Sequence, residues 1–325
     1  DDLVGTITTD DKGIAQLENL PAGKYYVKET ATAHGYVLDS EIRYVDLSYR
    51  DQDTPVITFD EDWQNARQKV IVQVLKKEKN VDRVLAGGVF GLYAAEDIRS
   101  VSGKVLLKAD EIIEQKTTDE NGQISFLADL PVDGKYYVKE LKAPDGFVTT
   151  EEKQEFTFEY KGENVTEVPY EFTCENEPTT VELTKSDLTT GEELPGAHLK
   201  VTDKDGNIVD EWISEKNPHV IKELTVGKKY TLTETKPADG FVTAESIEFT
   251  VENTAEIQRH EMKDDITKVQ ISKTDITGDK EIPGAKLIIL DKNDQVVENW
   301  ISTDKPHYVE KLPVGNYTLR EEQAP

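Results

Sequence analysis

The chain has 325 residues, of which 65 are acidic and 38 are basic, and its formal charge is −27. So negative a chain repels phosphate backbones and anionic lipid, so we expect neither nucleic acid nor a membrane surface as a partner. No apolar run approaches the length of a bilayer span. A single cysteine, Cys174, excludes an intrachain disulfide framework and a multi-cysteine metal site.

The chain is a repeat array. Residues 181–213 and 269–301 align nearly residue for residue, and a second half-unit with a Gly-Lys-Tyr turn recurs near positions 23, 134, 228 and 315. Four units follow: 1–67, which lacks its opening strand; 68–178, complete with an insertion; 179–266, complete; and 267–325, which stops before a closing strand. The sequence thus predicts a piece of a longer tandem protein.

Each unit is predicted to be a β-sandwich. Segments of four to eight residues alternate apolar with polar side chains and end at turn dipeptides such as Asn121-Gly122 and Asp205-Gly206. Short strands at regular spacing favour antiparallel, Ig-like sandwiches. The fold class is therefore all-β, a tandem array of sandwich domains. A single helical turn is expected at 109–114, inside the insertion at 92–118 of the second unit.

A lysine occupies the core-facing register of every opening strand, because residues two apart share one face of a strand. The sets are Val72, Val74 and Lys76; Val181, Leu183 and Lys185; and Val269, Ile271 and Lys273. The neighbouring Lys77 faces the other way by the same parity, so Lys76 is the residue of interest in the second unit.

A glutamate ends the apolar face of each tyrosine-containing strand. The sets are Tyr25, Val27 and Glu29; Tyr136, Val138 and Glu140; Tyr230, Leu232 and Glu234; and Tyr317, Leu319 and Glu321. The closing strands carry a carboxamide or carboxyl group on the face of their core-facing apolar residues. These groups belong to Asn65, Asn176 and Asp264. Asp264 and Asn176 each precede the next lysine by nine residues, and Asn65 by eleven, whereas Asn253 would give twenty and is a poor alternative.

Lysine, glutamate and Asn or Asp buried together make a reaction possible. Burial disfavours both charged forms, which lowers the pKa of a lysine and raises that of a glutamate. A neutral amine is a nucleophile, and a protonated glutamate can polarise the acceptor group and shuttle protons to the leaving group. Attack would release ammonia from Asn or water from Asp and leave an amide between the first and last strands. Fixed proximity would make the reaction spontaneous.

The combined pattern resembles CnaB-type (SpaA-type) domains. It consists of a strand ending in Lys-Ser/Thr-Asp, then Gly-Ala-x-Leu, then Gly-Lys-Tyr with the glutamate, then a closing strand with Asn or Asp. The second unit departs from it with Lys76-Lys77-Glu78 and Gly87-Gly88-Val89-Phe90. The resemblance implies self-formed isopeptide bonds Lys76–Asn176 and Lys185–Asp264, promoted by Glu140 and Glu234. Glu29 with Asn65, and Lys273 with Glu321, form partial triads that lack a third member.

The resemblance also implies a role. Such domains build the stalks of Gram-positive adhesins and pilins, so we expect an extracellular spacer anchored to a cell wall through parts outside this chain. The expected partners are neighbouring repeats of the same chain, with any host ligand bound by parts not present, and the chain is expected to be monomeric. Cross-linking is a single-turnover self-modification, so no enzyme and no cofactor is expected.

Two other functions stay open. A ligand-binding adhesin module would recognise host protein or glycan through loops at the ends of a sandwich, with the insertion at 92–118 as the place to look. An enzyme would need a catalytic domain beyond this chain. The aspartate-rich turns at 203–207 and 291–294 lack the spacing of a calcium loop and read as hairpins. The histidines have no metal-ligand spacing, so no metal site is expected; they are His34, His198, His219, His260 and His307.

Overall fold

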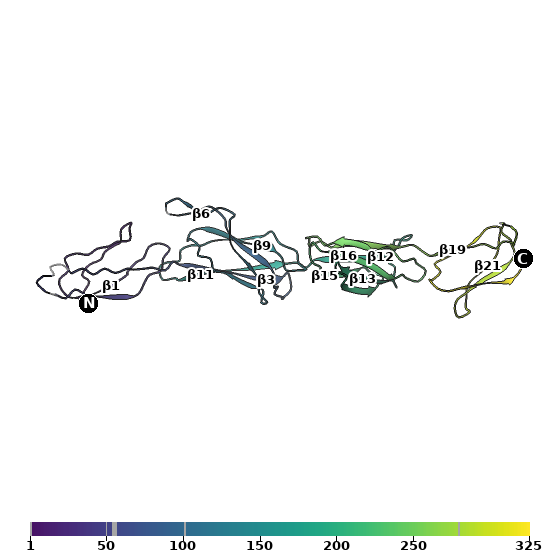
Figure 1. The fold of residues 1–325 in the computed structure, drawn as a ribbon, viewed down its shortest axis with the longest axis horizontal. Coiled ribbons are helices and arrows are strands. Elements are labelled where there is room, and N and C mark those ends of the chain that lie inside the picture. The colour runs from purple at the N-terminus through teal and green to yellow at the C-terminus, as the bar shows by residue number, and fades with distance from the viewer. Residues whose placement is uncertain (1, 50, 54–56, 101, 279) are drawn as a thin grey trace.

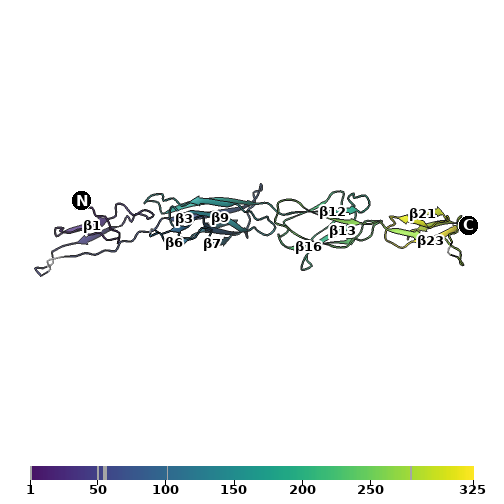
Figure 2. The same ribbon diagram turned by 90° about the horizontal axis from the view of Figure 1, so that it is seen from above.

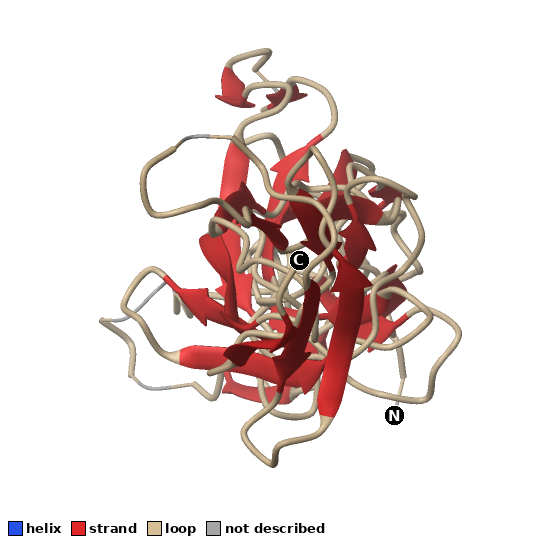
Figure 3. Cartoon of the chain, turned by 90° about the vertical axis from the view of Figure 1, so that its right-hand side faces the viewer, coloured by secondary structure: helices blue, strands red, loops and turns tan. Residues whose placement is uncertain are grey.

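The computed structural model describes residues 2–49, 51–53, 57–100, 102–278 and 280–325. In two perpendicular views the four units follow one another in a long row, with the termini at opposite ends (Figure 1, Figure 2). Seen end-on, strands and loops make up all of the part that the structure describes (Figure 3). That part also contains no helix long and apolar enough to cross a membrane. The predicted all-β architecture is confirmed.

The second unit is a sandwich of two sheets. One sheet has three strands in the order β11-β3-β8, and the other has four in the order β10-β9-β4-β7. The strands are β3 (Lys69–Glu78), β4 (Val89–Ala94), β7 (Ile112–Thr117), β8 (Gln123–Phe126), β9 (Lys135–Lys142), β10 (Lys153–Thr157) and β11 (Glu167–Asn176). Alternate side chains of both inner faces form one core around Val72, Leu92, Phe126 and Tyr136.

The third unit repeats this topology strand for strand. Its sheets have the orders β15-β12-β18 and β14-β13-β16-β17. The strands are β12 (Thr180–Asp187), β13 (His198–Asp203), β14 (Ile208–Ile213), β15 (His219–Lys222), β16 (Lys229–Lys236), β17 (Ile247–Thr250) and β18 (Gln258–Asp264). Val181, Leu199, Leu232 and Met262 lie in its core.

The two end units contain only part of this set. The described residues of the first unit pair β1 (Lys24–Lys28) with β2 (Ile42–Asp46). The fourth unit pairs β19 with β22 and β20 with both β21 and β23. These strands are β19 (Lys268–Ile271), β20 (Lys286–Leu290), β21 (Val296–Ile301), β22 (His307–Glu310) and β23 (Thr318–Gln323).

The first and last strands of each complete unit are parallel, although every other pairing in those units is antiparallel. In the β3–β11 pair Lys76 lies opposite Cys174, and in the β12–β18 pair Lys185 lies opposite Met262. Because faces alternate along a strand, the residue two positions further on shares the face of the lysine. That residue is Asn176 in one unit and Asp264 in the other.

The insertion of the second unit differs from its prediction. The helical turn expected at 109–114 is wrong, because 112–117 form the edge strand β7 against β4. Pairing to an open sheet edge outweighs the local preference of these residues for helix. The rest of the insertion forms a small hairpin of β5 (Ile98–Arg99) and β6 (Val105–Leu107), which projects from the row (Figure 1).

The repeat-equivalent histidines pack on tryptophans. The His219 ring stacks on Trp212 at 4.0 Å and 10°, and the His307 ring stacks on Trp300 at 4.3 Å and 8°. Trp212 and His219 belong to edge strands of opposite sheets, so the stack joins the two layers along one open side of the sandwich.

A buried hydroxyl group holds the loop that follows the lysine strand. Leu85 N–H donates to the Lys76 carbonyl (2.9 Å), and Thr118 Oγ1 donates to the Leu85 carbonyl (2.9 Å) and accepts from Gly88 N–H (2.9 Å). The next two units repeat these three hydrogen bonds with serine in place of threonine, through Leu194, Ser214 and Ala197 and through Ile282, Ser302 and Ala285. This hydroxyl relay, made by Thr118, Ser214 and Ser302, holds the backbone on the carbonyl side of each lysine.

Thr118→Val should release this loop. The variant keeps the shape of the side chain but leaves a buried N–H and a buried carbonyl without a partner, each worth about 1–3 kcal/mol. Hydrogen exchange at the Gly88 amide should therefore accelerate by about tenfold or more. Thr118→Ser is the matched control and should exchange like the unsubstituted chain, because serine serves the other two units. Equal exchange in the valine variant would show that the hydroxyl does not hold the loop.

Candidate functional site

Three polar side chains meet in the core of the second unit. Lys76 and Asn176 project from the parallel strands β3 and β11 of one sheet, and Glu140 faces them from β9 of the other sheet. All three are at most 2% exposed. Alternation of faces dictates this burial, because each residue continues a run of core-facing aliphatic or aromatic side chains.

Glu140 contacts both other residues with its two oxygens. Its Oε1 lies 3.2 Å from Lys76 Nζ, and its Oε2 accepts a hydrogen bond of 2.9 Å from Asn176 Nδ2. The backbone N–H of Thr150 also donates to Oε2 (2.9 Å), and Asn176 Nδ2 donates to the Val148 carbonyl (2.8 Å). Among the described residues, Asn176 Oδ1 has no hydrogen-bond partner. One carboxyl group thus touches the amine and the amide nitrogen together.

The third unit assembles the same group with an acid in place of the amide. Lys185 Nζ lies 2.9 Å from Glu234 Oε1 and donates a hydrogen bond to Asp264 Oδ1. Glu234 Oε2 accepts from the backbone N–H of Ala244 (2.7 Å), ten residues further on, just as Glu140 accepts from Thr150. Among the described residues, no hydrogen-bond partner faces Asp264 Oδ2.

Burial sets the ionisation of these groups. Desolvation lowers the pKa of Lys76, although Glu140 opposes the effect by favouring the ammonium form. Desolvation also raises the pKa of Asp264 to about 6, with Lys185 opposing and Glu234 reinforcing the change. Both changes favour the neutral forms, an amine in one unit and a carboxylic acid in the other.

The partial triads are more exposed. In the first unit Asn65 Nδ2 donates to Glu29 Oε2 (2.6 Å) and to the Val37 carbonyl (2.9 Å). Asp39 N–H donates to Glu29 Oε2 at 2.7 Å. In the fourth unit Lys273 Nζ donates to Glu321 Oε2 at 3.1 Å, with side chains 26% and 35% exposed. The structure therefore brings together each pair that the sequence assigned to these units.

The rejected candidates lie elsewhere. Lys77 Nζ reaches outward to the exposed Asp82 (2.7 Å). Asn253 Oδ1 accepts a hydrogen bond from the backbone N–H of Thr149, in the preceding unit (2.9 Å). Cys174 is a buried free thiol whose pKa desolvation raises to about 11, so it stays protonated at neutral pH. In the described residues no group of three His, Cys, Asp or Glu is placed to hold a metal ion.

A hollow at the surface reaches the site of the second unit. Asn176, Val148 and Thr150 line it together with Lys79, Thr149, Glu152, Thr173, Glu175, Glu177 and Ala255. Sequence reasoning found the three polar residues but not this hollow or the hydroxyl relay, since an isolated Thr or Ser at a strand end gives no signal of burial.

The comparisons with known proteins agree with this description. The model of the SpaA prealbumin-like fold domain matches residues 1–63, 70–171, 179–266 and 267–325. A search of curated proteins found no match.

Several solved structures are similar to the chain. The Bacillus anthracis TIE protein shares 25% identity, with a TM-score of 0.43 over 80% of this chain and 46% of that one. The shaft pilin SpaA of Lactobacillus rhamnosus GG shares 16% identity, with a TM-score of 0.28 over 62% and 98%. A streptococcal ancillary pilin shares 20% identity, with a TM-score of 0.30 over 77% and 79%.

The chain spans less than half the length of the TIE protein. The resemblance found in the sequence is confirmed by the family model, which matches nearly the whole chain in four successive copies. The protein therefore belongs to the family of SpaA prealbumin-like fold domains.

Proposed function

We propose that the units 68–178 and 179–266 are domains that cross-link themselves, and that the chain serves as a tension-bearing spacer of an extracellular surface protein or pilus. The observation that carries this proposal is the meeting of Lys, Glu and Asn or Asp in two dry cores, between parallel first and last strands. Membership of the SpaA family and the likeness to pilin folds support the surface role.

In the second unit the neutral Nζ of Lys76 attacks the carboxamide carbon of Asn176. A carbon–nitrogen bond forms, and the bond to Nδ2 breaks. Glu140 touches Nζ with one oxygen and Nδ2 with the other, so it can pass a proton from the amine to the departing nitrogen. The products are a secondary amide and ammonia. The orphaned Oδ1 is the atom on which negative charge develops.

In the third unit Lys185 attacks the carboxyl carbon of Asp264. Here the leaving group is a hydroxyl that departs as water, which requires the carboxyl group to be protonated. Burial promotes this form, because it raises the pKa of Asp264. Glu234, in contact with the lysine, moves the proton. The product is the same amide in both units.

An amide at these positions shortens the path of a pulling force. Force entering at residue 68 runs along β3 to Lys76, crosses to Asn176 and leaves at residue 178, so about 100 residues of the unit carry none of it. Closing a loop of that length also stabilises the fold by about 4.7 kcal/mol, by analogy with a disulfide. A stalk gains extension resistance and protease resistance from the same bond.

Intact mass tests the chemistry. We expect the chain to be lighter than its sequence by one ammonia and one water. Glu140→Ala should restore the ammonia and Glu234→Ala the water, each without affecting the other unit. Peptide mapping should find Lys76 joined to Asn176 and Lys185 joined to Asp264. A folded chain of unmodified mass would refute the cross-link and leave the fold unaffected.

The two bonds should respond differently to pH. The acid acceptor Asp264 must be protonated to lose water, whereas the amide acceptor Asn176 carries no carboxyl group that has to hold a proton. Above pH about 6 the cluster with Asp264 loses one of its protons. Bond formation in the third unit should then slow by up to tenfold per pH unit, and the second unit, whose acceptor is an amide, should not share this slowing. Refolding from denaturant, with timed acid quenches and peptide mass analysis, measures both rates in one sample.

Single-molecule pulling tests the mechanical role. The cross-linked second unit should release only about ten residues, those outside the bond. Glu140→Ala should add an extension event of about 350 Å, since about 100 freed residues span up to roughly 3.5 Å each. The matching Glu234→Ala event should be shorter, because Lys185 and Asp264 are 79 residues apart. Full-length extension of both units in the unsubstituted chain would contradict a spacer role.

One observation favours a second function. The β5–β6 hairpin projects from the row, belongs to the second unit alone among the described parts, and exposes Leu106. A ligand-binding loop would have this form. Deleting 99–107 should then abolish binding to immobilised host extracellular proteins while the two mass losses persist. Unchanged binding would leave the spacer as the sole role of this unit.

A further inference from the structure

The second, third and fourth units meet through one repeated backbone contact. Gly146 and Gly240 lie in equivalent turns after the glutamate strands, at φ of +89° and +86°. Facing them from the following unit are Glu223 and Lys311, non-glycine residues in the left-handed region at φ of 63° and 58°. Left-handed backbone at a charged, long side chain is uncommon, and here it recurs at the same place in successive units.

The backbones approach too closely for any side chain on the glycines. A Cβ added to Gly146 would lie 2.7 Å from the Glu223 carbonyl oxygen, and one added to Gly240 would lie 2.6 Å from the Lys311 carbonyl oxygen. Each position requires glycine for two reasons: the backbone has a positive φ, and the contact leaves no room for a Cβ.

A threonine ties the two sides together. Thr179 N–H donates to the Gly146 carbonyl (2.9 Å), its hydroxyl donates to the Leu224 carbonyl (2.6 Å), and its own carbonyl accepts from Glu223 N–H (3.0 Å). Thr267 makes the same three bonds, to Gly240 (2.9 Å), Leu312 (2.7 Å) and Lys311 (3.0 Å). The linker thus joins the preceding turn to the following unit instead of swinging freely.

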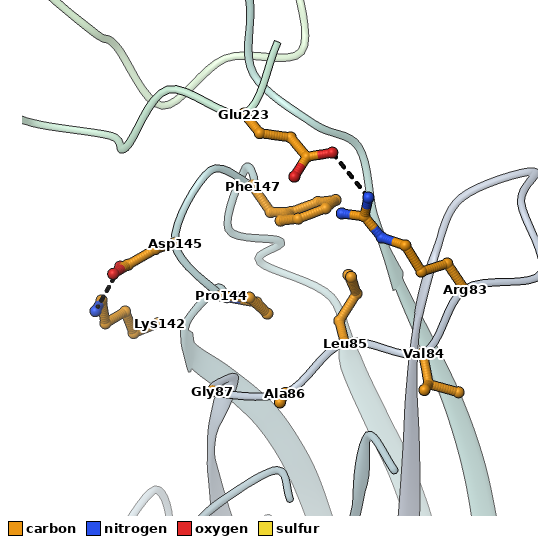
Figure 4. Close-up of a pocket in the computed structure, with 10 residues that line it drawn as sticks. All are labelled: Arg83, Val84, Leu85, Ala86, Gly87, Lys142, Pro144, Asp145, Phe147 and Glu223. Carbon is orange, nitrogen blue, oxygen red and sulfur yellow. Dashed lines mark hydrogen bonds and ion pairs between the residues drawn. The ribbon is translucent and has the colours of Figure 1, made fainter. Parts of the chain in front are cut away.

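The side chains at the left-handed position distinguish the two boundaries. Glu223 pairs with Arg83 of the preceding unit (2.9 Å), and Arg83 lies over the Phe147 ring at 5.1 Å (Figure 4). At the next boundary the signs are reversed: Lys311 pairs with Asp187 of the preceding unit (3.4 Å) and itself lies over the Phe241 ring at 5.2 Å. At both boundaries a cation lies over the equivalent phenylalanine ring. Arg83 belongs to the same unit as Phe147, whereas Lys311 belongs to the unit that follows Phe241.

The first boundary is a variant of the same arrangement. Gly35 is at φ +88°, and a Cβ added to it would lie 3.1 Å from the Val132 side chain of the second unit. The left-handed residue there is Asp133, at φ 62°, four residues after Asp129, which holds the repeat position of Glu223 and Lys311. His34 Nε2 lies 2.6 Å from Asp133 Oδ2, and Gln68 N–H donates to the Gly35 carbonyl at 2.9 Å. Each of the three boundaries therefore has its own charged pair, but the contact of the glycine with a left-handed residue's carbonyl belongs to the two later boundaries.

We propose that this contact is a built joint that fixes each unit against the next, and that its charged pair selects which unit can follow. The docking surface is the glycine turn with its aromatic neighbour, and its partner is the threonine linker and left-handed residue of a second SpaA unit. If the following units were exchanged between the two boundaries, like charges would meet and the fit would be lost. Arg83 would then face Lys311, and Asp187 would face Glu223. Neighbouring units then stabilise one another, as in other repeat arrays. The joint does not depend on the cross-link.

The test compares two glycine variants of the full chain. Gly146→Ala forces a Cβ into the joint, whereas Gly103→Ala imposes a similar left-handed strain, at φ +82°, where nothing lies within 4 Å. Exchange of the Thr179 and Glu223 amides should rise at least tenfold in the first variant and stay unchanged in the second. Small-angle scattering should show a broader distribution of shapes only for Gly146→Ala. Equal behaviour of the two variants would overturn the joint.

Charge exchange tests selection and covers the case in which Gly146→Ala fails to fold. Arg83→Glu and Glu223→Arg should each accelerate exchange of the same two amides about threefold, and the double variant should restore the original rate. Failure of the double variant to recover would refute selection by charge. Every variant should still be lighter than its own sequence by one ammonia and one water, a readout that rests on the proposed cross-link and separates its loss from loss of the joint.

Discussion

The structure depends on a lysine held in a dry core against a carboxyl group from the opposite sheet. A lone ammonium group in that position would be prohibitively costly, and even a buried ion pair regains little more than its desolvation penalty. Lys76 and Lys185 occupy positions where an aliphatic residue would stabilise the sandwich more simply. The proposed cross-link would account for such placement in two successive units, since a covalent amide would remove the buried charge together with its cost.

Parallel pairing of the first and last strands connects this chemistry to mechanics. Because β3 and β11 run side by side in the same direction, the chain enters the unit at one end and leaves it at the other. The lysine and its acceptor lie near the exit end of both strands, so the proposed bond would carry the tension of the whole unit. The joint continues the path: Thr179 follows Asn176 by three residues, and Thr267 follows Asp264 by the same number. The proposed cross-link and the proposed joint would thus be adjacent along the path of a pulling force.

Strand parity predicted the fold class and the members of each triad, because a period of two leaves no freedom about which residues share a face. Parity also favoured Lys76 over Lys77, whereas the spacing to the next lysine favoured Asp264 over Asn253. Parity could not reveal the joint, since Glu223 and Lys311 are not glycine, asparagine or aspartate, the residues that signal left-handed backbone. The helical turn at 109–114 failed for the opposite reason: its residues favour helix locally, and the open edge of β4 overrides that preference.

The first unit indicates which part of the site comes from local sequence. Its Glu29 accepts from the backbone ten residues further on, and Asn65 donates to a carbonyl 28 residues earlier, as Glu140 and Asn176 do in the second unit. These bonds form without a lysine strand among the described residues, so the glutamate strand and the turn after it suffice to orient the acceptor. What the lysine strand adds is burial, because Glu29 and Asn65 are only half-buried. The orientation of the acceptor therefore comes from local sequence, and its burial comes from the lysine strand of the complete units.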